Sequence, residues 1–187
     1  MNLEMHNQLF FELTVELQSK LKMTIDNCEK RNVKMQIIEG LRNPFLQAIY
    51  WRQSRKIKEI KAKIDELNEA QAFFLSFCIK AVGSQYGTFA TNAIPGFSWH
   101  QWGEAADCVW VIQGKKCWDL NLLVDNINGY RVYAEEARKV GLDCGFFWPH
   151  FQDACHVQLK EIAGPDKLIS IKDIDLQMQI RFEDLIK

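Results

Sequence analysis

The stretch "FSWHQWGEAADCVW" places two potential metal ligands, His100 and Asp107, seven residues apart with Gly103 between them. A single α-helix would put both side chains on one face but roughly 10.5 Å apart along its axis, and an unbroken strand would send them to opposite faces. Both can therefore reach one ion only if the chain bends between them. Glycine permits such a bend. We predict a turn carrying His100, followed by a strand from about Ala105 that presents Asp107 inward.

A third ligand is available in "FQDACHVQL", where His156 opens another predicted strand and Asp153 stands three residues earlier. Two histidines and one carboxylate around an open fourth position are a usual arrangement for catalytic zinc. An acid beside the ligands, not itself bound, can accept a proton from water. The alternative is that these histidines are packed or surface residues among aromatic neighbours, and their spacing alone leaves it open.

Six cysteines are present, but no Cys-x-x-Cys pair occurs. Cys108 and Cys155 flank proposed ligands, yet strand alternation would point them away from the site. We therefore expect Cys108 to pack with Ala106 and Trp110 on the opposite face. Reduced, packed thiols are the expectation for all six.

Composition indicates a globular protein: of 187 residues, 48% are hydrophobic and 25% charged, with a net charge of −1. This balance disfavours nucleic acid as a partner, because phosphate binding needs a basic face. A lysine- and arginine-rich run at 52–63 is read as a solvated helix face. The N-terminal residues do not resemble a secretory signal, and the most apolar run, ending at Val82, is shorter than the ~20 residues of a membrane span. We expect cytoplasmic synthesis.

Hydrophobic periodicity and capping residues indicate an α+β fold in which a small sheet is packed by helices. Asn43 and Pro44 are typical of a helix start, and Ser170 of another. The predicted helices are one over the first twenty residues, one from Pro44 to a break near Ser54, one from there to Val82, one over 129–140 and one over about 170–186. The predicted strands lie in "VKMQIIEG", "EAADCVWVI", "LDCGFFW" and "CHVQLKEI", and a polar turn is predicted at 26–32.

The pattern Ser98-x-His100-x-x-Gly103-x-Ala105-x-Asp107, followed by Asp153-x-x-His156, resembles the D-Ala-D-Ala metallopeptidase family. That family includes D-alanyl-D-alanine carboxypeptidases and dipeptidases and the L-alanyl-D-glutamate endopeptidases of phage endolysins. The segments "IIEGLRNPFLQAIYWRQSR" and "AEEARKVGLDCGFFWPHFQDACHVQL" are similar to its first strand and helix and to its closing helix, turn and strand. The resemblance implies a Hedgehog/DD-peptidase-like single domain over 1–187, with a core at 33–159, a helical insertion at about 56–84 and extra terminal helices.

The resemblance also implies roles for individual residues. One Zn²⁺ would be held by His100, Asp107 and His156. Asp153 would be the catalytic acid/base, and Arg42 would hold the substrate and the developing oxyanion. Two further positions, Ser98 and Trp148, match motif residues that support the site.

Two departures from the family pattern concern the shape of the pocket. The usual Gly-Gly-x-Trp turn reads Gly145-Phe146-Phe147-Trp148, and the usual Pro-His-Phe reads Cys155-His156-Val157. Neither change removes a ligand, so the expected consequence is an altered substrate preference.

The substrate implied by the resemblance is the stem peptide of peptidoglycan, and an endolysin-like L-alanyl-D-glutamate endopeptidase is the first expectation. Such an enzyme would remain in the cytoplasm until a holin-type partner released it to the wall. The alternatives are a D-alanyl-D-alanine carboxypeptidase, a non-catalytic zinc-containing protein that binds the wall or a partner, and a helical interaction protein without metal. Asp153 argues against a purely structural zinc, which needs no base.

Overall fold

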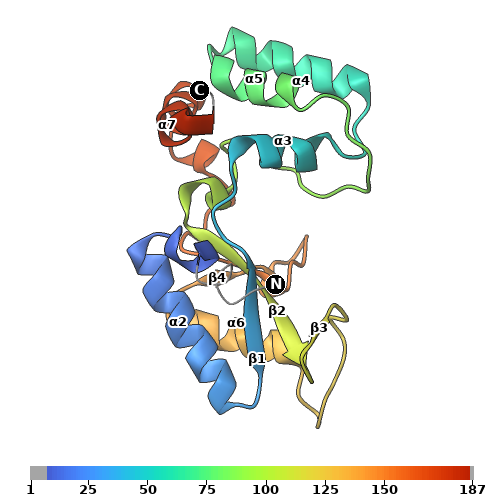
Figure 1. Cartoon of the computed structure of the whole chain (residues 1–187), viewed down its shortest axis with the longest axis vertical. Helices are drawn as coiled ribbons and strands as arrows, with labels where there is room; N and C mark the ends of the chain where they lie inside the picture. Colours follow the sequence, from blue (N-terminus) through green and yellow to red (C-terminus); the bar gives the residue numbers. More distant parts are fainter. Residues whose placement is uncertain (1–7, 186–187) are drawn as a thin grey trace. The chain divides into compact units, whose positions relative to one another are not determined.

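The computed structural model describes residues 8–185 (Figure 1). Its contacts divide the chain into two compact units, one built from 1–41 and 102–161 and the other from 42–101 and 162–187. Each unit thus combines two separate chain segments. The single domain expected from the sequence stays a prediction.

The first unit contains a five-stranded antiparallel sheet formed by β1 (Lys34–Glu39), β2 (Ala105–Ile112), β3 (Lys115–Cys117), β4 (Asp143–Cys144) and β5 (His156–Gln158). Four strands follow the order β1-β2-β5-β4, and β3 pairs with β2. This sheet, with its surrounding helices, confirms the α+β class. The predicted strand "LDCGFFW" is shorter than expected, because the chain turns into the 3₁₀ helix η2 (Gly145–Phe147) directly after β4.

Two helices, α2 (Val15–Lys30) and α6 (Gly129–Lys139), pack on this sheet. The core between them gathers apolar residues from α2, β1, β2 and α6, including Leu17, Leu21, Met35, Ala106, Cys108, Trp110, Tyr130 and Tyr133. Gly129 lies against the Trp110 ring, where an added Cβ would come within 2.3 Å of a ring carbon. Any larger residue at position 129 would therefore push α6 off the sheet.

The predicted boundaries of the N-terminal helix are wrong, as is the polar turn at 26–32. The Thr14 side chain accepts a hydrogen bond from the Leu17 N–H, so that α2 begins at Val15. Buried Cys28 continues the apolar stripe of α2, while polar residues such as Asp26 occupy its solvent face. The turn is confined to the end of the helix, with Asn32 at φ 57°. The part of this prediction that concerns residues 1–7 lies outside the described residues.

The second unit is helical: its helices are α3 (Pro44–Arg52), α4 (Ile57–Glu69), α5 (Phe73–Ala81) and α7 (Ile171–Arg181). As predicted, the Asn43 side chain caps α3 by accepting from the Leu46 N–H at 2.9 Å. Ser170 caps α7 in the same way by accepting from the Asp173 N–H. Both caps satisfy backbone donors that a helix start otherwise leaves unpaired.

The predicted break near Ser54 is confirmed by its φ of 63°, but the single helix that was to follow it is wrong. The segment expected to form that helix is divided at Gln71, whose backbone is also left-handed with a φ of 60°. The helix after the division, α5, folds back against α4. The start of α5 is satisfied from another helix, because Asp175 of α7 accepts the Leu75 N–H at 2.8 Å. No helix among residues 8–185 combines the length and apolarity needed to cross a bilayer.

Candidate metal centre

A bend separates His100 from Asp107, as the sequence predicts. His100 lies in the 3₁₀ helix η1 (Trp99–Trp102), and Gly103 follows in the left-handed region at φ 69°. The Thr14 N–H donates to the Gly103 carbonyl at 2.9 Å and so ties the bend to the start of α2. β2 then begins at Ala105. The turn and the strand are both confirmed.

Strand pairing brings Asp107 and His156 together in the first unit. The two residues are directly opposed on the antiparallel strands β2 and β5. Their side chains are 17% and 10% exposed, and His156 Nδ1 lies 3.1 Å from Asp107 Oδ1. Two ligands of a tetrahedral zinc ion with bonds of about 2.0–2.1 Å are roughly 3.4 Å apart, so this pair already has nearly the required separation.

The second ring nitrogen of His156 is held by Gln158, which sequence reasoning did not identify. Nε2 lies 3.0 Å from Gln158 Oε1, and an amide oxygen only accepts, so Nε2 carries the proton. The orientation of the amide follows from its nitrogen, which donates to the Lys160 carbonyl and, at 3.4 Å, to Asp143. In the neutral imidazole Nδ1 therefore carries the lone pair, on the Asp107 side, as a metal ligand requires, whereas in the imidazolium the Nδ1–H donates to Asp107.

The protonation of His156 reflects two opposing effects. Burial lowers the pKa of the imidazole, but the hydrogen bond and negative charge of Asp107 outweigh it and the pKa is raised. The negative environment that favours the imidazolium would equally favour a dication. Since a metal ion binds only the deprotonated nitrogen, metal binding here must release a proton at low pH.

His100 completes a group of three. His100, Asp107 and His156 each offer one ligand atom, and these atoms all lie within 4.8 Å of one another. Two nitrogen donors and one carboxylate suit Zn²⁺ in its catalytic form, in which the fourth position is left for water or substrate. The donor chemistry and spacing of these residues thus fit the metal that the sequence predicts.

The two cysteines beside the ligands are packing residues in the first unit. Cys108 is fully buried in the core, and burial raises the pKa of its thiol. Burial likewise raises the pKa of Cys155 to about 12, and its sulfur lies 3.9 Å from the Tyr130 hydroxyl. Because thiolate is the metal-binding form, neutral thiols agree with the expectation that neither cysteine is a ligand.

The turn before β5 carries Asp153 and is closed by Gly145. The Asp153 N–H donates to the Gly145 carbonyl at 3.0 Å, and the His156 N–H donates to the Asp153 carbonyl at 3.2 Å. A Cβ at position 145 would lie 2.4 Å from the Asp153 carbonyl oxygen, which explains the glycine. Trp148 packs its ring 5.2 Å from the His156 ring and donates to Asp143 at 2.9 Å. The backbone of Asp153, three residues before His156, is thus fixed by hydrogen bonds to Gly145 and His156.

Two buried glutamines of the second unit link Arg42 to the segment that carries Ser98 and His100. Arg42 donates to Gln47 Oε1 at 2.9 Å, and Gln101 donates to the same oxygen at 2.9 Å. Gln101 Oε1 in turn accepts the Ser98 N–H at 3.2 Å, while the Arg42 N–H donates to the His100 carbonyl at 3.2 Å. Arg42 itself is 8% exposed and lies over the Tyr50 ring.

Sequence reasoning missed these glutamines because an amide carries no ligand signature of its own. For Gln158 a signal existed: in "HVQ" it stands two residues after His156, and strand alternation places both on one face. For Gln47 and Gln101 no comparable signal is present. Each is fully buried, and only the tertiary fold brings them together.

With the geometry established, comparison with known proteins identifies the family. Residues 11–158 match the family VanY, D-alanyl-D-alanine carboxypeptidase. The chain belongs to this family, the D-Ala-D-Ala metallopeptidases, and is a peptidase of the peptidoglycan-acting VanY type. The matched region begins in front of the core predicted at 33–159 and so includes α2.

Seven chains of solved structures match, and two of them serve as examples. The L-Ala D-Glu endopeptidase ChiX of Serratia marcescens is 17% identical, with 83% of this chain and 86% of that chain covered and a TM-score of 0.45. A variant of the D,D-pentapeptidase VanY from a VanB-type vancomycin resistance cassette, in complex with Zn(II), is 16% identical, with 90% and 83% covered and a TM-score of 0.42. No protein with a curated description matches the chain.

Proposed function

We propose that this protein is a zinc-dependent hydrolase of the peptidoglycan stem peptide. The observation that carries the proposal is the group His100, Asp107 and His156, whose ligand atoms lie within 4.8 Å of one another in a chain of the VanY family. When bound, zinc supplies a Lewis acid that polarises a carbonyl group and makes water acidic enough to react near neutral pH.

The residues of this chain would then divide the remaining work. Asp153 accepts a proton from the attacking water and returns it to the leaving amine as general acid. Arg42 stabilises the negative charge that develops on the scissile carbonyl oxygen, and its guanidinium is pre-oriented for this by Gln47 and Tyr50. Gln158 keeps the proton of His156 on Nε2.

Two bonds of the stem peptide are candidates. The L-alanyl-D-glutamate bond is the first expectation from the sequence, and the description of the matched family favours the terminal D-alanyl-D-alanine bond. Both substrates carry free carboxylates and D-residues. The protein would reach them only after release to the cell wall.

The test is to incubate zinc-loaded protein with purified peptidoglycan and with a soluble pentapeptide stem, and to analyse the products by mass spectrometry and N-terminal labelling. A new L-alanine C-terminus with a new glutamate amino group identifies the endopeptidase. Free D-alanine identifies the carboxypeptidase. Absence of both products from zinc-loaded protein would overturn the proposal and leave the non-catalytic, wall-binding alternative.

Two variants separate chemistry from metal binding. Asp153→Ala should retain stoichiometric zinc but lose hydrolysis by at least about 10²-fold, since general acid–base catalysis contributes 10²–10⁴. His156→Ala should lose both zinc and hydrolysis. Zinc content measured by inductively coupled plasma mass spectrometry beside each rate distinguishes them, and full activity of Asp153→Ala would remove the acid/base assignment.

A further inference from the structure

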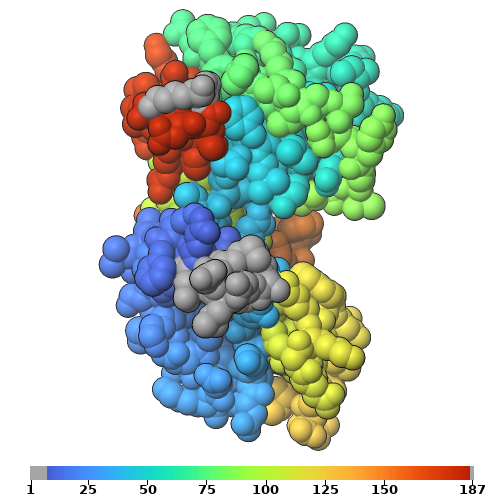
Figure 2. Space-filling view, in the orientation of Figure 1, coloured from blue at the N-terminus to red at the C-terminus, as the bar shows by residue number. Residues whose placement is uncertain are grey.

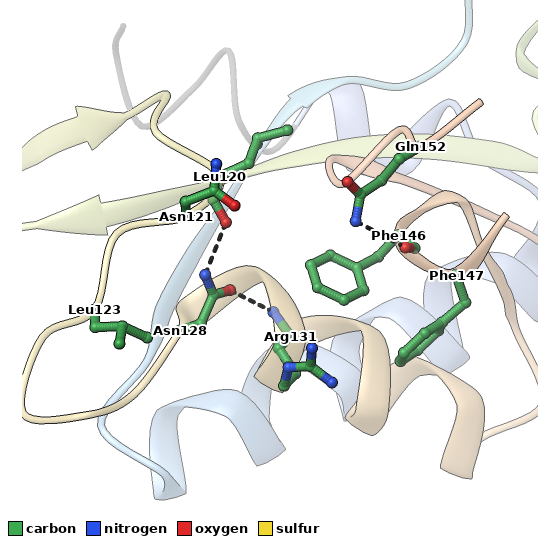
Figure 3. Close-up of a pocket in the computed structure, with 8 residues that line it drawn as sticks. All are labelled: Leu120, Asn121, Leu123, Asn128, Arg131, Phe146, Phe147 and Gln152. Atoms are coloured by element: carbon green, nitrogen blue, oxygen red, sulfur yellow. Dashed lines mark hydrogen bonds between the residues drawn. The ribbon is translucent and has the colours of Figure 1, made fainter. Parts of the chain in front are cut away.

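A cavity with a volume of about 440 Å³ lies in the first unit, between the segment that follows β3, the start of α6 and the turn that follows β4 (Figure 3). It is lined by Leu120, Asn121, Leu123, Asn128, Arg131, Phe146, Phe147 and Gln152. This volume is within the range of small-ligand sites. None of the chemistry proposed above uses the cavity.

The wall of the cavity carries one cation and no acid. Its cation, Arg131, lies over the Phe146 ring with its guanidinium carbon 5.4 Å from the ring centre. The acid one turn further along α6, Glu135, is engaged elsewhere, because Arg31 binds it at 2.9 Å. Among the described residues, Arg131 has no carboxylate partner within ion-pair distance. The positive charge of the guanidinium is therefore not neutralised by a neighbouring carboxylate, and its N–H donors can bind a ligand.

The remaining lining groups are apolar rings and chains or neutral amides. Phe146 and Phe147 meet edge to face with their ring centres 5.1 Å apart, and Leu120 and Leu123 lie across from them in Figure 3. Leu123 lies in the segment coloured yellow to gold in Figure 2 and is 59% exposed. A ligand that fits this wall combines a carboxylate with a short apolar or amide portion.

The same turn forms this wall and carries the proposed catalytic acid. Gln152, directly before Asp153, donates from its side chain to the Phe146 carbonyl at 3.0 Å. Gly145, directly before Phe146, accepts the Asp153 N–H. Phe146 also replaces the second glycine of the family's Gly-Gly-x-Trp turn, so this wall is a feature of the present chain.

We propose that this cavity is a substrate subsite that binds a free carboxylate of the stem peptide away from the scissile bond, with Arg131 as its anchor. The inference rests on the proposed function for the identity of the substrate. The chemical class of its ligand, a carboxylate beside an apolar or amide group, follows from the lining residues alone.

Kinetics with matched substrates test the subsite. The substrates are a stem peptide with a free glutamyl α-carboxylate and the same peptide with that group amidated. Arg131→Gln should raise KM for the free acid by about tenfold or more, the loss of one hydrogen-bonded charge pair, and should raise KM far less for the amide. Arg138→Gln is the control, because Arg138 makes the equivalent contact over the Phe147 ring but does not line the cavity. Equal KM values for wild type and Arg131→Gln would overturn the proposal.

Binding to the zinc-free protein keeps this test independent of hydrolysis. The probes are a γ-D-glutamyl dipeptide and its amide, followed by methyl NMR of Leu120 and Leu123. The expected result is saturable shifts with the acid in wild type and in Arg138→Gln, and their loss in Arg131→Gln. Absence of shifts with the acid would overturn the subsite even if the protein cleaves peptidoglycan. Conversely, shifts without any cleavage would overturn the proposed function and leave the binding site in place.

Discussion

At the scale of single residues, the candidate centre depends on amide side chains as much as on its ligands. His156 can use Nδ1 toward a metal because Gln158 accepts a hydrogen bond from its Nε2–H, and the Gln158 amide is itself oriented by Lys160 and Asp143. Such partners of ligand histidines typically change metal affinity by 10–100-fold when they are removed. They raise affinity by ordering the imidazole before the metal arrives.

Gln158→Leu should therefore weaken zinc binding by about 10–100-fold. The physical reason is that the Nε2–H loses its acceptor and the ring its fixed tautomer. Competition with a chromophoric chelator measures the affinity, and ¹⁵N NMR of the His156 ring reports the tautomer.

The comparison for this substitution is Gln158→Glu, which keeps an acceptor opposite Nε2 but loses the amide donor to Lys160 and Asp143. It should bind zinc more tightly than Gln158→Leu and keep the proton on Nε2. If both variants bind zinc as tightly as the original protein, Gln158 has only a packing role.

At the scale of secondary structure, the register of two strands decides which side chains meet. β2 and β5 pair so that Asp107 faces His156 and Ala105 faces Gln158. A slip of β5 by one residue would move His156 and Gln158 to the other face of the sheet, away from Asp107. The register is protected because the alternate residues, among them Cys108 and Val157, are buried in the core against α2 and α6.

The end of α2 is joined to α6 by charged groups that give a pH-dependent prediction. Glu136, with its side chain 5% exposed, lies 2.8 Å from Arg31 and 2.7 Å from Lys139. Burial raises the pKa of Glu136, but the hydrogen bonds from Lys139 and Arg31 outweigh it, so the pKa in the folded protein is lowered. A lowered carboxyl pKa stabilises the folded state above the pKa of the unfolded chain, and this stabilisation is lost as pH falls through the folded value.

Glu136→Gln should accordingly lower the free energy of unfolding by about 1 kcal/mol at pH 7, because Arg31 and Lys139 are partly screened by solvent. The difference from wild type should begin to shrink as pH falls below about 4, where the carboxyl of the unfolded chain is protonated, and should vanish once pH lies below the lowered folded-state pKa. Urea unfolding at several pH values measures it. The matched variant is Glu135→Gln, which removes a more exposed partner of Arg31 and should cost less. A deficit that is the same at pH 3 and pH 7 would exclude the charge interaction as its source.

At the scale of the whole molecule, metal binding should appear as thermal stability. A zinc ion that binds the folded chain alone contributes about 2.7 kcal/mol when its free concentration is a hundred times its Kd. For a protein of this size that corresponds to a rise in Tm of about 5–10 °C. Differential scanning calorimetry with zinc and with a chelator measures this.

Two variants serve as controls for the zinc-dependent rise in Tm. Asp153→Ala should show the full zinc-dependent rise in Tm, and His156→Ala should show none. A rise in Tm that survives in His156→Ala would place the stabilising zinc elsewhere. The same scans count the transitions and so test the single domain that the sequence predicts.

Much of the fold could be predicted because residues close in sequence determine helix starts and chain bends. Asn43 and Ser170 cap their helices as expected, and Gly103 bends the chain between two ligands. The boundaries of α2 and the division of the helix after Ser54 could not be predicted in the same way. Gln71 has no strong intrinsic preference for a break, and Asp175, 100 residues beyond Leu75 in the chain, satisfies the helix that starts after it.

The sequence by itself determined the candidate chemistry of this protein: the types of the proposed ligands, the proposed acid before the last of them, the bend that a shared ion would require and the order of motifs that marks the family. These are properties of residue type and short spacing. The backbone geometry of turns and strands then decides directly where the side chains lie. The tertiary structure alone decided which neutral side chains support that chemistry and where a cavity forms. The amide of Gln47 is held by Ala93 and that of Gln158 by Asp143, both distant in sequence, and the cavity beside Arg131 exists only because three separate segments enclose it.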